Sequence, residues 1–178
     1  MIKSSQKIIL DYQKLVKAIK AHKVLNKKIV CTIGSWDVLH IGHLRYLKKA
    51  KELGDILVVG VDSDKTIKTY KHTSLGPIIP QDERIEMLSY QSFVDYITLI
   101  NDVDKKGRWK MGLIKSIKPN IFVATTGESY PIEQRKEIAK FCGQLKILPR
   151  QARNTSTTKI IERTFKKHLK YILSNTKL

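Results

Sequence analysis

Apolar and polar positions along this chain follow two periods, one typical of buried strands and one typical of amphipathic helices. Residues 28–33 are apolar at nearly every position, as expected of a strand that is covered on both faces. Asp11 can cap a helix whose apolar residues recur at spacings of three and four. Strands are predicted at residues 28–33, 55–61, 94–100, 121–124 and 145–148, and helices that begin near residues 12, 41, 64, 83, 109, 132 and 156.

Strands and helices alternate regularly, which predicts a parallel sheet with right-handed crossovers. The expected fold class is α/β, a Rossmann-like three-layer fold with a five-stranded parallel sheet. We expect one domain over residues 1–178, with a leading amphipathic helix within residues 1–27 packed on it. The last helix is predicted to turn its apolar residues inward, namely Ile160, Ile161, Phe165, Leu169 and Ile172.

The excess of basic residues predicts an anionic partner. Lys and Arg number 34 against 16 Asp and Glu, a formal net charge of +18. Phosphorylated small molecules, nucleic acid and acidic surfaces would all suit this charge. The excess is mostly lysine spread along the chain, so it can also reflect a composition shared by a whole proteome. Because the basic residues are scattered and aromatic residues make up only 7% of the chain, we do not expect a nucleic-acid partner.

Cysteine usage and hydropathy bear on the compartment. Cys31 and Cys142 lie far apart in apolar surroundings, which predicts two buried thiols and neither a disulfide framework nor a metal site. No apolar run reaches the length of a membrane span, and the lysine-rich start lacks the apolar core of a signal peptide. We therefore expect a soluble, cytoplasmic protein without a membrane partner.

The most informative stretch is residues 34–43, between the first predicted strand and the next helix. His40 and His43 are three residues apart, so in a helix they share one face near the end where backbone N–H groups are unpaired. Gly42 leaves room for a ligand to approach the backbone. A helix N-terminus with two added donors suits a polyphosphate. The alternative is that the two histidines merely cap a surface helix.

This stretch resembles the His-x-Gly-His signature of the nucleotidyltransferase superfamily, in particular the cytidylyltransferase-like group. That group includes heptose-1-phosphate adenylyltransferases and glycerol-3-phosphate cytidylyltransferases. The leading segment before the first strand is similar to the heptose type. Class I aminoacyl-tRNA synthetases share the four letters His-Ile-Gly-His, but this chain has no Lys-Met-Ser-Lys-Ser-type loop and no room for an anticodon-binding domain.

The resemblance implies transfer of AMP or CMP from ATP or CTP to a phosphorylated small molecule, with release of pyrophosphate. The acceptor would be a sugar-1-phosphate or polyol phosphate, with the heptose-1-phosphate type favoured and the glycerol-3-phosphate type as the alternative. Mg²⁺ is expected with the nucleoside triphosphate, and we also expect a homodimer. A basic nucleic-acid-binding protein and a non-catalytic nucleotide-binding protein are the alternatives from another functional class.

Two further segments reach the same edge of the expected sheet, where ligands bind in such folds. Residues 154–158 combine hydroxyls with the start of the last helix and resemble the superfamily's Ser-Thr-Thr signature for the outer phosphates. In the glycerol-3-phosphate enzymes an arginine lies just upstream of this signature. The spacing in this chain is one residue longer, so either Arg150 or Arg153 could correspond to that arginine. In the other segment, Lys71 and Arg84 match family positions that handle the acceptor and the triphosphate.

The substrate-reading positions depart from the family pattern. Lys71-His72 and Gly76-Pro77 replace the usual Lys-Gly and Arg-Pro, and residues 124–129 replace a lysine, two glycines and an aspartate. Asp37 either fixes its turn or lies beside the acceptor. The expected catalytic residues are His40, His43, Lys71 and Arg84; the expected nucleotide-binding residues are Ile33, Gly34, Trp36, Gly42, Thr125, Gly127, Arg150, Arg153, Ser156, Thr157 and Thr158; and the expected acceptor-binding residues are Asp37 and Lys68, with no metal ligand from the protein.

Overall fold

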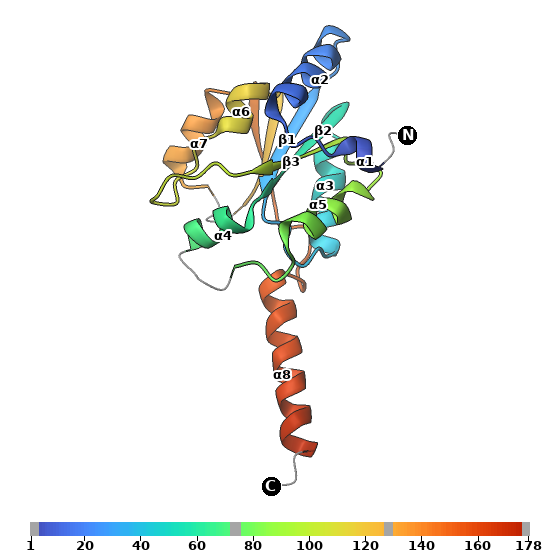
Figure 1. Ribbon diagram of the computed structural model, residues 1–178, viewed down its shortest axis with the longest axis vertical. Coiled ribbons are helices and arrows are strands. Elements are labelled where there is room, and N and C mark those ends of the chain that lie inside the picture. The colour runs from blue at the N-terminus through green and yellow to red at the C-terminus, as the bar shows by residue number, and fades with distance from the viewer. Residues whose placement is uncertain (1–3, 72–75, 127–129, 176–178) are drawn as a thin grey trace.

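The computed structural model of the chain describes residues 4–71, 76–126 and 130–175. Its centre is one sheet of five parallel strands in the order β3-β2-β1-β4-β5 (Figure 1). The predicted α/β fold is therefore confirmed. The strands are β1 (Ile29–Gly34), β2 (Ile56–Asp62), β3 (Tyr96–Ile100), β4 (Ile121–Thr125) and β5 (Gln144–Leu148).

Helices cover both faces of this sheet. In Figure 1, α3 and α5 lie on one side of the strands, and α6 and α7 lie on the other. The helices are α1 (Ser4–Lys7), α2 (Tyr12–Val24), α3 (Ile41–Lys51), α4 (Asp64–Lys71), α5 (Gln81–Ser89), α6 (Gly112–Ile117), α7 (Ile132–Ala139) and α8 (Thr157–Asn175).

Side chains of successive strand residues pack alternately into two hydrophobic cores, one on each face of the sheet. Val30 packs in the core under α3 and α5, whereas its neighbours Ile29 and Cys31 pack under α2, α6 and α7. All three side chains are fully buried. The apolar run at residues 28–33 is thus explained by burial on both faces, as the sequence predicts. Cys31 and Cys142 are both free thiols, and Cys142 is only partly buried.

The leading helix α2 forms as its sequence predicts. The Asp11 carboxylate accepts hydrogen bonds from the backbone N–H groups of Gln13 (2.8 Å) and Lys14 (3.3 Å) at the helix start. Leu15 and Ile19 are buried against the sheet. No helix in the described part of the chain is long and apolar enough to cross a membrane.

The segment before α6 differs from the prediction, which placed Trp109 in the helix. The helix begins only at Gly112, because Met111 adopts a left-handed conformation (φ 63°) that an α-helix does not tolerate. Trp109 instead pairs with Val103 in an antiparallel bridge across a tight hairpin. Apolar spacing alone does not reveal this break.

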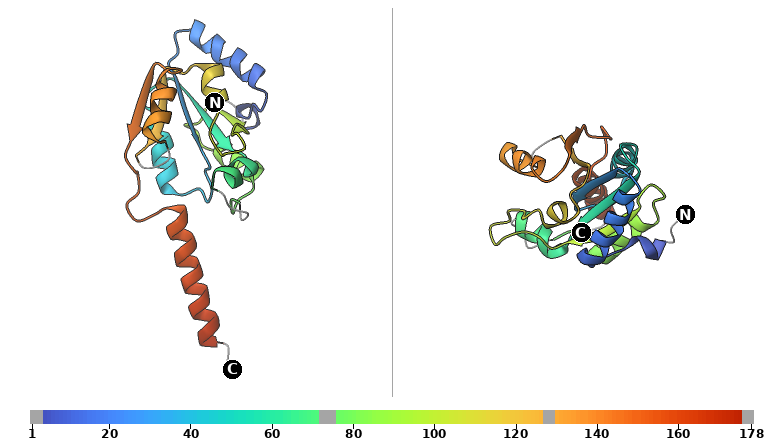
Figure 2. Two further views of the ribbon diagram at one scale, coloured as in Figure 1. Left: turned by 90° about the vertical axis from the view of Figure 1, so that its left-hand side faces the viewer. Right: turned by 90° about the horizontal axis from the view of Figure 1, so that it is seen from above.

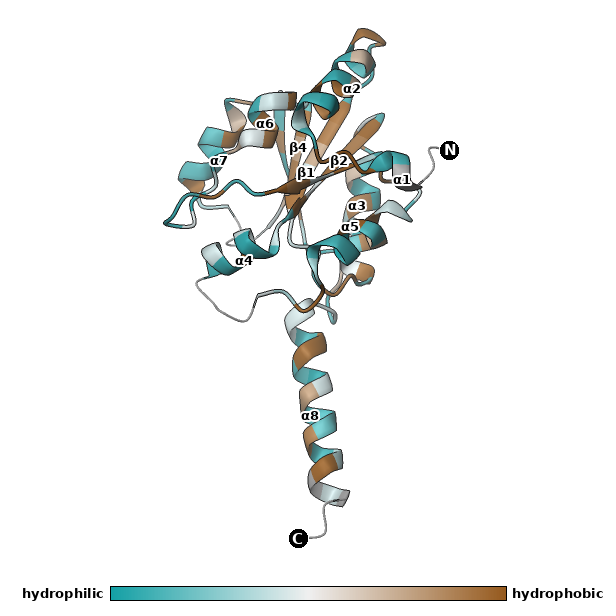
Figure 3. Ribbon diagram, viewed as in Figure 1, coloured by the Kyte–Doolittle hydropathy of each residue, from teal (hydrophilic) through white to brown (hydrophobic). Residues whose placement is uncertain are grey.

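The last helix, α8, also differs from the prediction. It extends away from the rest of the molecule in two perpendicular views (Figures 1 and 2). Apolar bands run along its length (Figure 3). Four of the residues predicted to face inward are exposed instead: Ile161 (42%), Phe165 (65%), Leu169 (44%) and Ile172 (55%). Periodicity correctly predicts an amphipathic helix, but it does not tell what covers the apolar face.

Candidate active site

A cavity of about 1170 Å³ opens at the carboxyl ends of the central strands. The chain order reverses there, since β1 has β2 on one side and β4 on the other. Such a switch point is where ligands bind in open parallel sheets. The starts of two helices, α3 and α8, line the same cavity through residues 40–43 and 155–158.

The two histidines at the start of α3 stack on each other. Their ring centroids are 3.9 Å apart at an interplanar angle of 21°. His40 is the N-cap residue, and its Nδ1 accepts a hydrogen bond from the Gly42 backbone N–H (3.0 Å). Because Nδ1 is the acceptor, the proton of the neutral ring lies on Nε2, which remains a donor.

Burial keeps both imidazoles neutral at pH 7. It lowers the pKa of His43 to about 4, with repulsion from His40 in the same direction and attraction to Asp37 opposing it. The pKa of His40 is also lowered by burial. His43 Nδ1 is buried without a hydrogen-bond partner among the described residues.

Gly34, Trp36 and Gly42 line the cavity and shape the histidine pair. Trp36 Nε1 donates to the Gly60 carbonyl (2.8 Å), and the indole lies edge-on to His43 with centroids 5.5 Å apart. A Cβ at Gly42 would lie 2.8 Å from His40 Cε1. Any side chain at this position would therefore displace His40 from the stack. Ile33 and Thr125 also line the cavity.

The hydroxyl cluster sits opposite, at the start of α8. Ser156, Thr157 and Thr158 all line the cavity. Ser156 Oγ accepts from the backbone N–H of Lys159 (3.3 Å), and Thr157 Oγ1 donates to the Asp37 carbonyl (2.9 Å). The latter bond ties the start of α8 to the loop before α3, so the two helix starts are held in one arrangement.

Of the basic residues predicted to bind the nucleotide or the acceptor, some line the cavity and others do not. Arg150 lines the cavity and Arg153 does not, so Arg150 is the better match for the family position. Likewise Lys71 lines the cavity, whereas Lys68 is exposed outside it and packs over Gly76. The structure therefore supports Lys71 over Lys68 at the cavity, and the acceptor-binding role of Lys68 stays a prediction. Gly127 lies outside the described residues.

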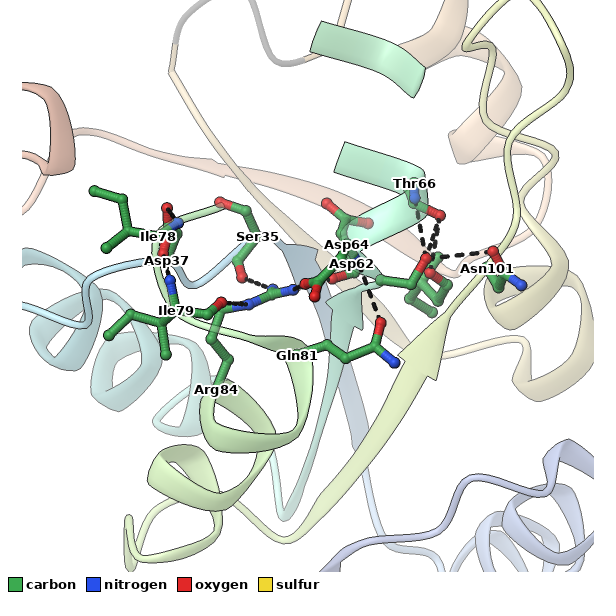
Figure 4. Close-up of polar contacts among 12 residues, drawn as sticks. Ser35, Asp37, Asp62, Asp64, Thr66, Ile78, Ile79, Gln81, Arg84 and Asn101 are labelled. Atoms are coloured by element: carbon green, nitrogen blue, oxygen red, sulfur yellow. Dashed lines mark hydrogen bonds and ion pairs between the residues drawn. The ribbon is translucent and has the colours of Figure 1, made fainter. Parts of the chain in front are cut away.

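Arg84 has a different role from the predicted one of holding reactants. Its side chain is fully buried and is absent from the cavity lining. It donates to the carbonyls of Ser35, Ile79 (2.9 Å) and Asp62 (2.8 Å) and forms an ion pair with Asp64 (2.7 Å). Figure 4 shows this guanidinium joining three segments. Arg84 therefore braces the carboxyl ends of β1 and β2 from below the site.

Asp37 likewise fixes backbone. Its carboxylate is buried and accepts from the N–H groups of Ile78 (3.0 Å) and Ile79 (2.9 Å) (Figure 4). It does not line the cavity. Of the two roles considered for Asp37, fixing the chain is the one that its contacts support, and the acceptor-binding role stays a prediction.

The sequence reasoning missed several residues that line the far part of the cavity. One signal was available, because Asp62 ends β2 beside the glycine turn after β1. Burial raises the pKa of Asp62 to about 6, against the opposing effects of Arg84, a hydrogen bond from Tyr70, and Lys71. A buried carboxyl group with a raised pKa at a strand end is typical of a functional site. The missed residues are Asp62, Tyr70, Arg108, Trp109 and Tyr130.

His43 and Asp62 are expected to give opposite pH dependences of stability. The folded-state pKa of His43 is depressed, so its contribution falls as pH drops from about 6.5 to 4. The folded-state pKa of Asp62 is raised, so its contribution grows as pH drops from about 6 to 4. Each slope is about 1.4 kcal/mol per pH unit, and in the wild type they largely cancel.

Urea unfolding between pH 4 and 8 measures these slopes. Relative to wild type, Asp62→Asn should lose stability on acidification and His43→Gln should gain it. Parallel profiles for the three proteins would show that neither group titrates in this way.

Comparisons with known proteins agree with this geometry. A family model described as cytidylyltransferase-like matches residues 31–163. The bifunctional protein HldE of a Nitratiruptor species is 39% identical over 119 residues, 67% of this chain and 24% of that protein. HldE of Desulfatibacillum aliphaticivorans is 34% identical over 155 residues, 84% of this chain and 29% of that protein. The chain thus spans less than a third of either relative.

One solved structure is similar along nearly its whole length. The lipopolysaccharide core biosynthesis protein from Thermoplasma volcanium GSS1 superposes with a TM-score of 0.57 at 29% sequence identity. The match covers 71% of this chain and 98% of that one.

Proposed function

This chain belongs to the cytidylyltransferase-like family of nucleotidyl-transferring enzymes, and we propose that it transfers AMP or CMP from ATP or CTP to a phosphorylated small molecule. One observation carries the proposal. The stacked His40–His43 pair and the Ser156 cluster begin two helices that face one cavity, joined by the Thr157–Asp37 hydrogen bond. Two helix N-termini and two imidazole rings at one site form a binding place for a polyphosphate.

In the proposed reaction, an oxygen of the acceptor phosphate attacks the α-phosphorus of the nucleotide in line. The new P–O bond forms as the bond from the α-phosphorus to the bridging oxygen breaks, and the electron pair leaves with pyrophosphate. Catalysis consists of positioning the two reactants and stabilising the growing negative charge. His40 Nε2–H and the His43 ring would donate to the transferring phosphoryl group. The start of α8 would hold the outer phosphates, and Lys71 would offset the charge of the reactants.

We propose that Mg²⁺ binds to the phosphates of the nucleoside triphosphate and enters the site with it. Among the described residues, no three His, Cys, Asp or Glu side chains come together as a metal site. Mg²⁺ commonly keeps several waters and binds substrate phosphates with few protein ligands. Bound in that way, it would neutralise charge on the phosphates, while the histidines and helix N-termini supply the hydrogen bonds.

For the acceptor, we propose a sugar-1-phosphate of the heptose type. The helix α2 before β1 and the similarity to HldE and to a lipopolysaccharide core biosynthesis protein support this choice. A glycerol-3-phosphate-type acceptor is the alternative. ATP and CTP both stay in the proposal, because the resemblance assigns the base to the turn after β4, and the sequence of that turn departs from the family pattern.

A matrix of substrates tests the function. ATP, CTP, GTP and UTP are combined with sugar-1-phosphates, glycerol 3-phosphate and other polyol phosphates in the presence of Mg²⁺, and pyrophosphate is measured. We expect release with ATP or CTP that requires one acceptor class and stops with EDTA. Nucleotide binding without turnover for any pair would favour a non-catalytic nucleotide-binding protein. Steeply salt-dependent binding to generic DNA would favour the nucleic-acid alternative.

The homodimer and the cytoplasmic location stay predictions. A dimer that covers the apolar residues of α8 would remove the exposure of Phe165 and Ile172, which are 65% and 55% exposed in the single chain. The basic residues of α8 would then remain in water, where they cost least.

A further inference from the structure

The last helix, α8, presents an exposed apolar stripe. Its four members recur every three or four residues and therefore lie on one face of the helix: Ile161, Phe165, Leu169 and Ile172. They are between 42% and 65% exposed, and every described side chain of α8 from residue 161 to residue 174 is exposed as well. We call these four residues the α8 stripe. Contiguous apolar surface on a projecting element indicates an interaction surface.

The first turn of α8 ties the helix to the body of the protein. Thr157 Oγ1 donates to the Asp37 carbonyl (2.9 Å), and Lys159 Nζ donates to the Arg153 carbonyl just before the helix (3.2 Å). The rest of the helix projects away from that body (Figures 1 and 2). A helix in water gains most of its stability from packing of its apolar face, so the projecting part of α8 requires a partner surface along the α8 stripe.

The charges of α8 are placed so that the α8 stripe can pack against a second helix. The positions that border the stripe hold Glu162, Thr164 and His168, and neither lysine nor arginine. The basic residues lie on the remaining faces of the helix: Lys159, Arg163, Lys166, Lys167 and Lys170. Two copies of α8 can therefore meet stripe to stripe while their basic side chains remain in water, where charges cost least.

The shape of the molecule decides how such a partner can approach. In each of two perpendicular views, the body of the protein extends beyond α8 on both sides at the root of the helix (Figures 1 and 2). A second copy with its helix parallel to α8 would bring its own body into the same space. A flat lipid surface along the α8 stripe would meet the same overhanging body. A second helix that runs antiparallel to α8 avoids this conflict, because its body lies at the far end of α8.

We propose that two copies of this chain form a dimer in which the two α8 helices pack antiparallel through the α8 stripe. The stripe is complementary to itself about a two-fold axis near residues 166 and 167. Ile161 lies opposite the partner's Ile172, and Phe165 lies opposite the partner's Leu169. The antiparallel direction also aligns the two helix dipoles favourably. This arrangement gives the expected homodimer a specific interface, which does not depend on the proposed reaction.

The same arrangement brings the end of one α8 to the start of the other, where residues 156–158 line the cavity. Two exposed apolar residues lie beside that start. Ile41 (46% exposed) opens α3, and Ile78 (58% exposed) donates its backbone N–H to the carboxylate of Asp37, the residue that also bonds Thr157. The end of the partner helix would lie next to them, so the interface continues from the α8 stripe onto the body close to the candidate active site.

Sedimentation velocity of the full chain without substrates tests the interface. We expect wild type to have twice the mass of one chain. Phe165→Glu should be monomeric, with its dimer dissociation constant raised at least about 30-fold, the scale for an interface hot spot. Lys170→Gln is the matched control, because it changes the net charge by the same single unit away from the stripe, and it should stay dimeric. A monomeric wild type, a dimeric Phe165→Glu or a monomeric Lys170→Gln would overturn the proposal.

Cross-linking tests the direction of the helices. Ile161→Cys and Ile172→Cys are prepared separately, each with Cys142→Ser because Cys142 is only partly buried. The two proteins are oxidised alone and after mixing. We expect a disulfide-linked dimer in the mixture and little in either protein alone, since residue 161 lies opposite the partner's residue 172. Efficient cross-linking of each protein with itself would show parallel helices and contradict the proposed arrangement.

Flotation with vesicles identifies the other possible occupant of the stripe. If wild type sediments as a monomer, it is mixed with phosphatidylcholine vesicles that contain phosphatidylglycerol. Binding that Phe165→Glu loses and Lys170→Gln keeps would assign the α8 stripe to an anionic lipid surface, against the proposal. None of these measurements uses a nucleotide or an acceptor, so their outcome is independent of the pyrophosphate screen for the proposed function.

Discussion

Replacing His40 or His43 with alanine is expected to slow turnover at least about 100-fold, the scale for losing one preorganised donor to a transition state. The structure supports this expectation because the stacked rings line the cavity and burial keeps them neutral, so each retains an N–H donor at pH 7. For His40→Ala, folding stability should fall by no more than about 1–2 kcal/mol, as for loss of a helix cap.

A variant of His40 separates catalysis from capping. His40 caps α3 through its Nδ1, which accepts from the Gly42 N–H. Asparagine at position 40 can accept the same bond, so His40→Asn should recover the stability lost in His40→Ala without recovering activity. Rates are measured under single-turnover conditions and stabilities by urea unfolding. Near-wild-type activity in both alanine variants would refute the catalytic assignment of the pair.

Ser156→Ala is expected to weaken triphosphate affinity by about ten- to a hundredfold, since one charge-assisted hydrogen bond contributes roughly 1.5–3 kcal/mol. Ser156 lines the cavity at the start of α8, where the unpaired backbone N–H groups of a helix start would also be available to a phosphate. Monophosphate affinity should hardly change, because that ligand has no β or γ phosphate to lose.

Calorimetric titration of both nucleotides into wild type and variant measures this difference. Ser156 Oγ accepts a rather long hydrogen bond from the Lys159 backbone N–H (3.3 Å), so its capping contribution is modest. Equal weakening for the two nucleotides would mean that Ser156 acts only by capping α8. The same titrations with Thr158→Ala show whether the neighbouring hydroxyl takes part.

The sheet could be predicted because its strands are buried on both faces. A run such as residues 28–33 has no polar face to confuse the pattern, and a glycine turn and a new helix follow it. The half of the cavity proposed to bind phosphate could be predicted for a related reason. Backbone N–H groups at a helix start need only the helix and a glycine turn, and both are visible as local sequence.

The remaining features depend on contacts between distant segments. The sequence presents Arg84 as a candidate cation for holding the reactants. Its partners Ser35 and Asp62 come from the ends of two strands, and only the folded chain shows that they surround the guanidinium. The apolar spacing predicts that a helix starts at Trp109. It gives no indication that Met111 adopts the left-handed conformation that prevents a helix there. The outward course of α8 is likewise a property of what surrounds it.

The proposed reaction joins an acceptor phosphate to the α-phosphate of a nucleotide. Phosphorus-31 NMR tests it most directly, on a reaction containing the protein, Mg²⁺, the nucleoside triphosphate and the acceptor selected by the pyrophosphate screen. We expect the signals of free pyrophosphate together with a new, coupled diphosphate pair that joins the nucleoside to the acceptor. Release of inorganic phosphate and a nucleoside diphosphate, with the acceptor signal unchanged, would contradict it.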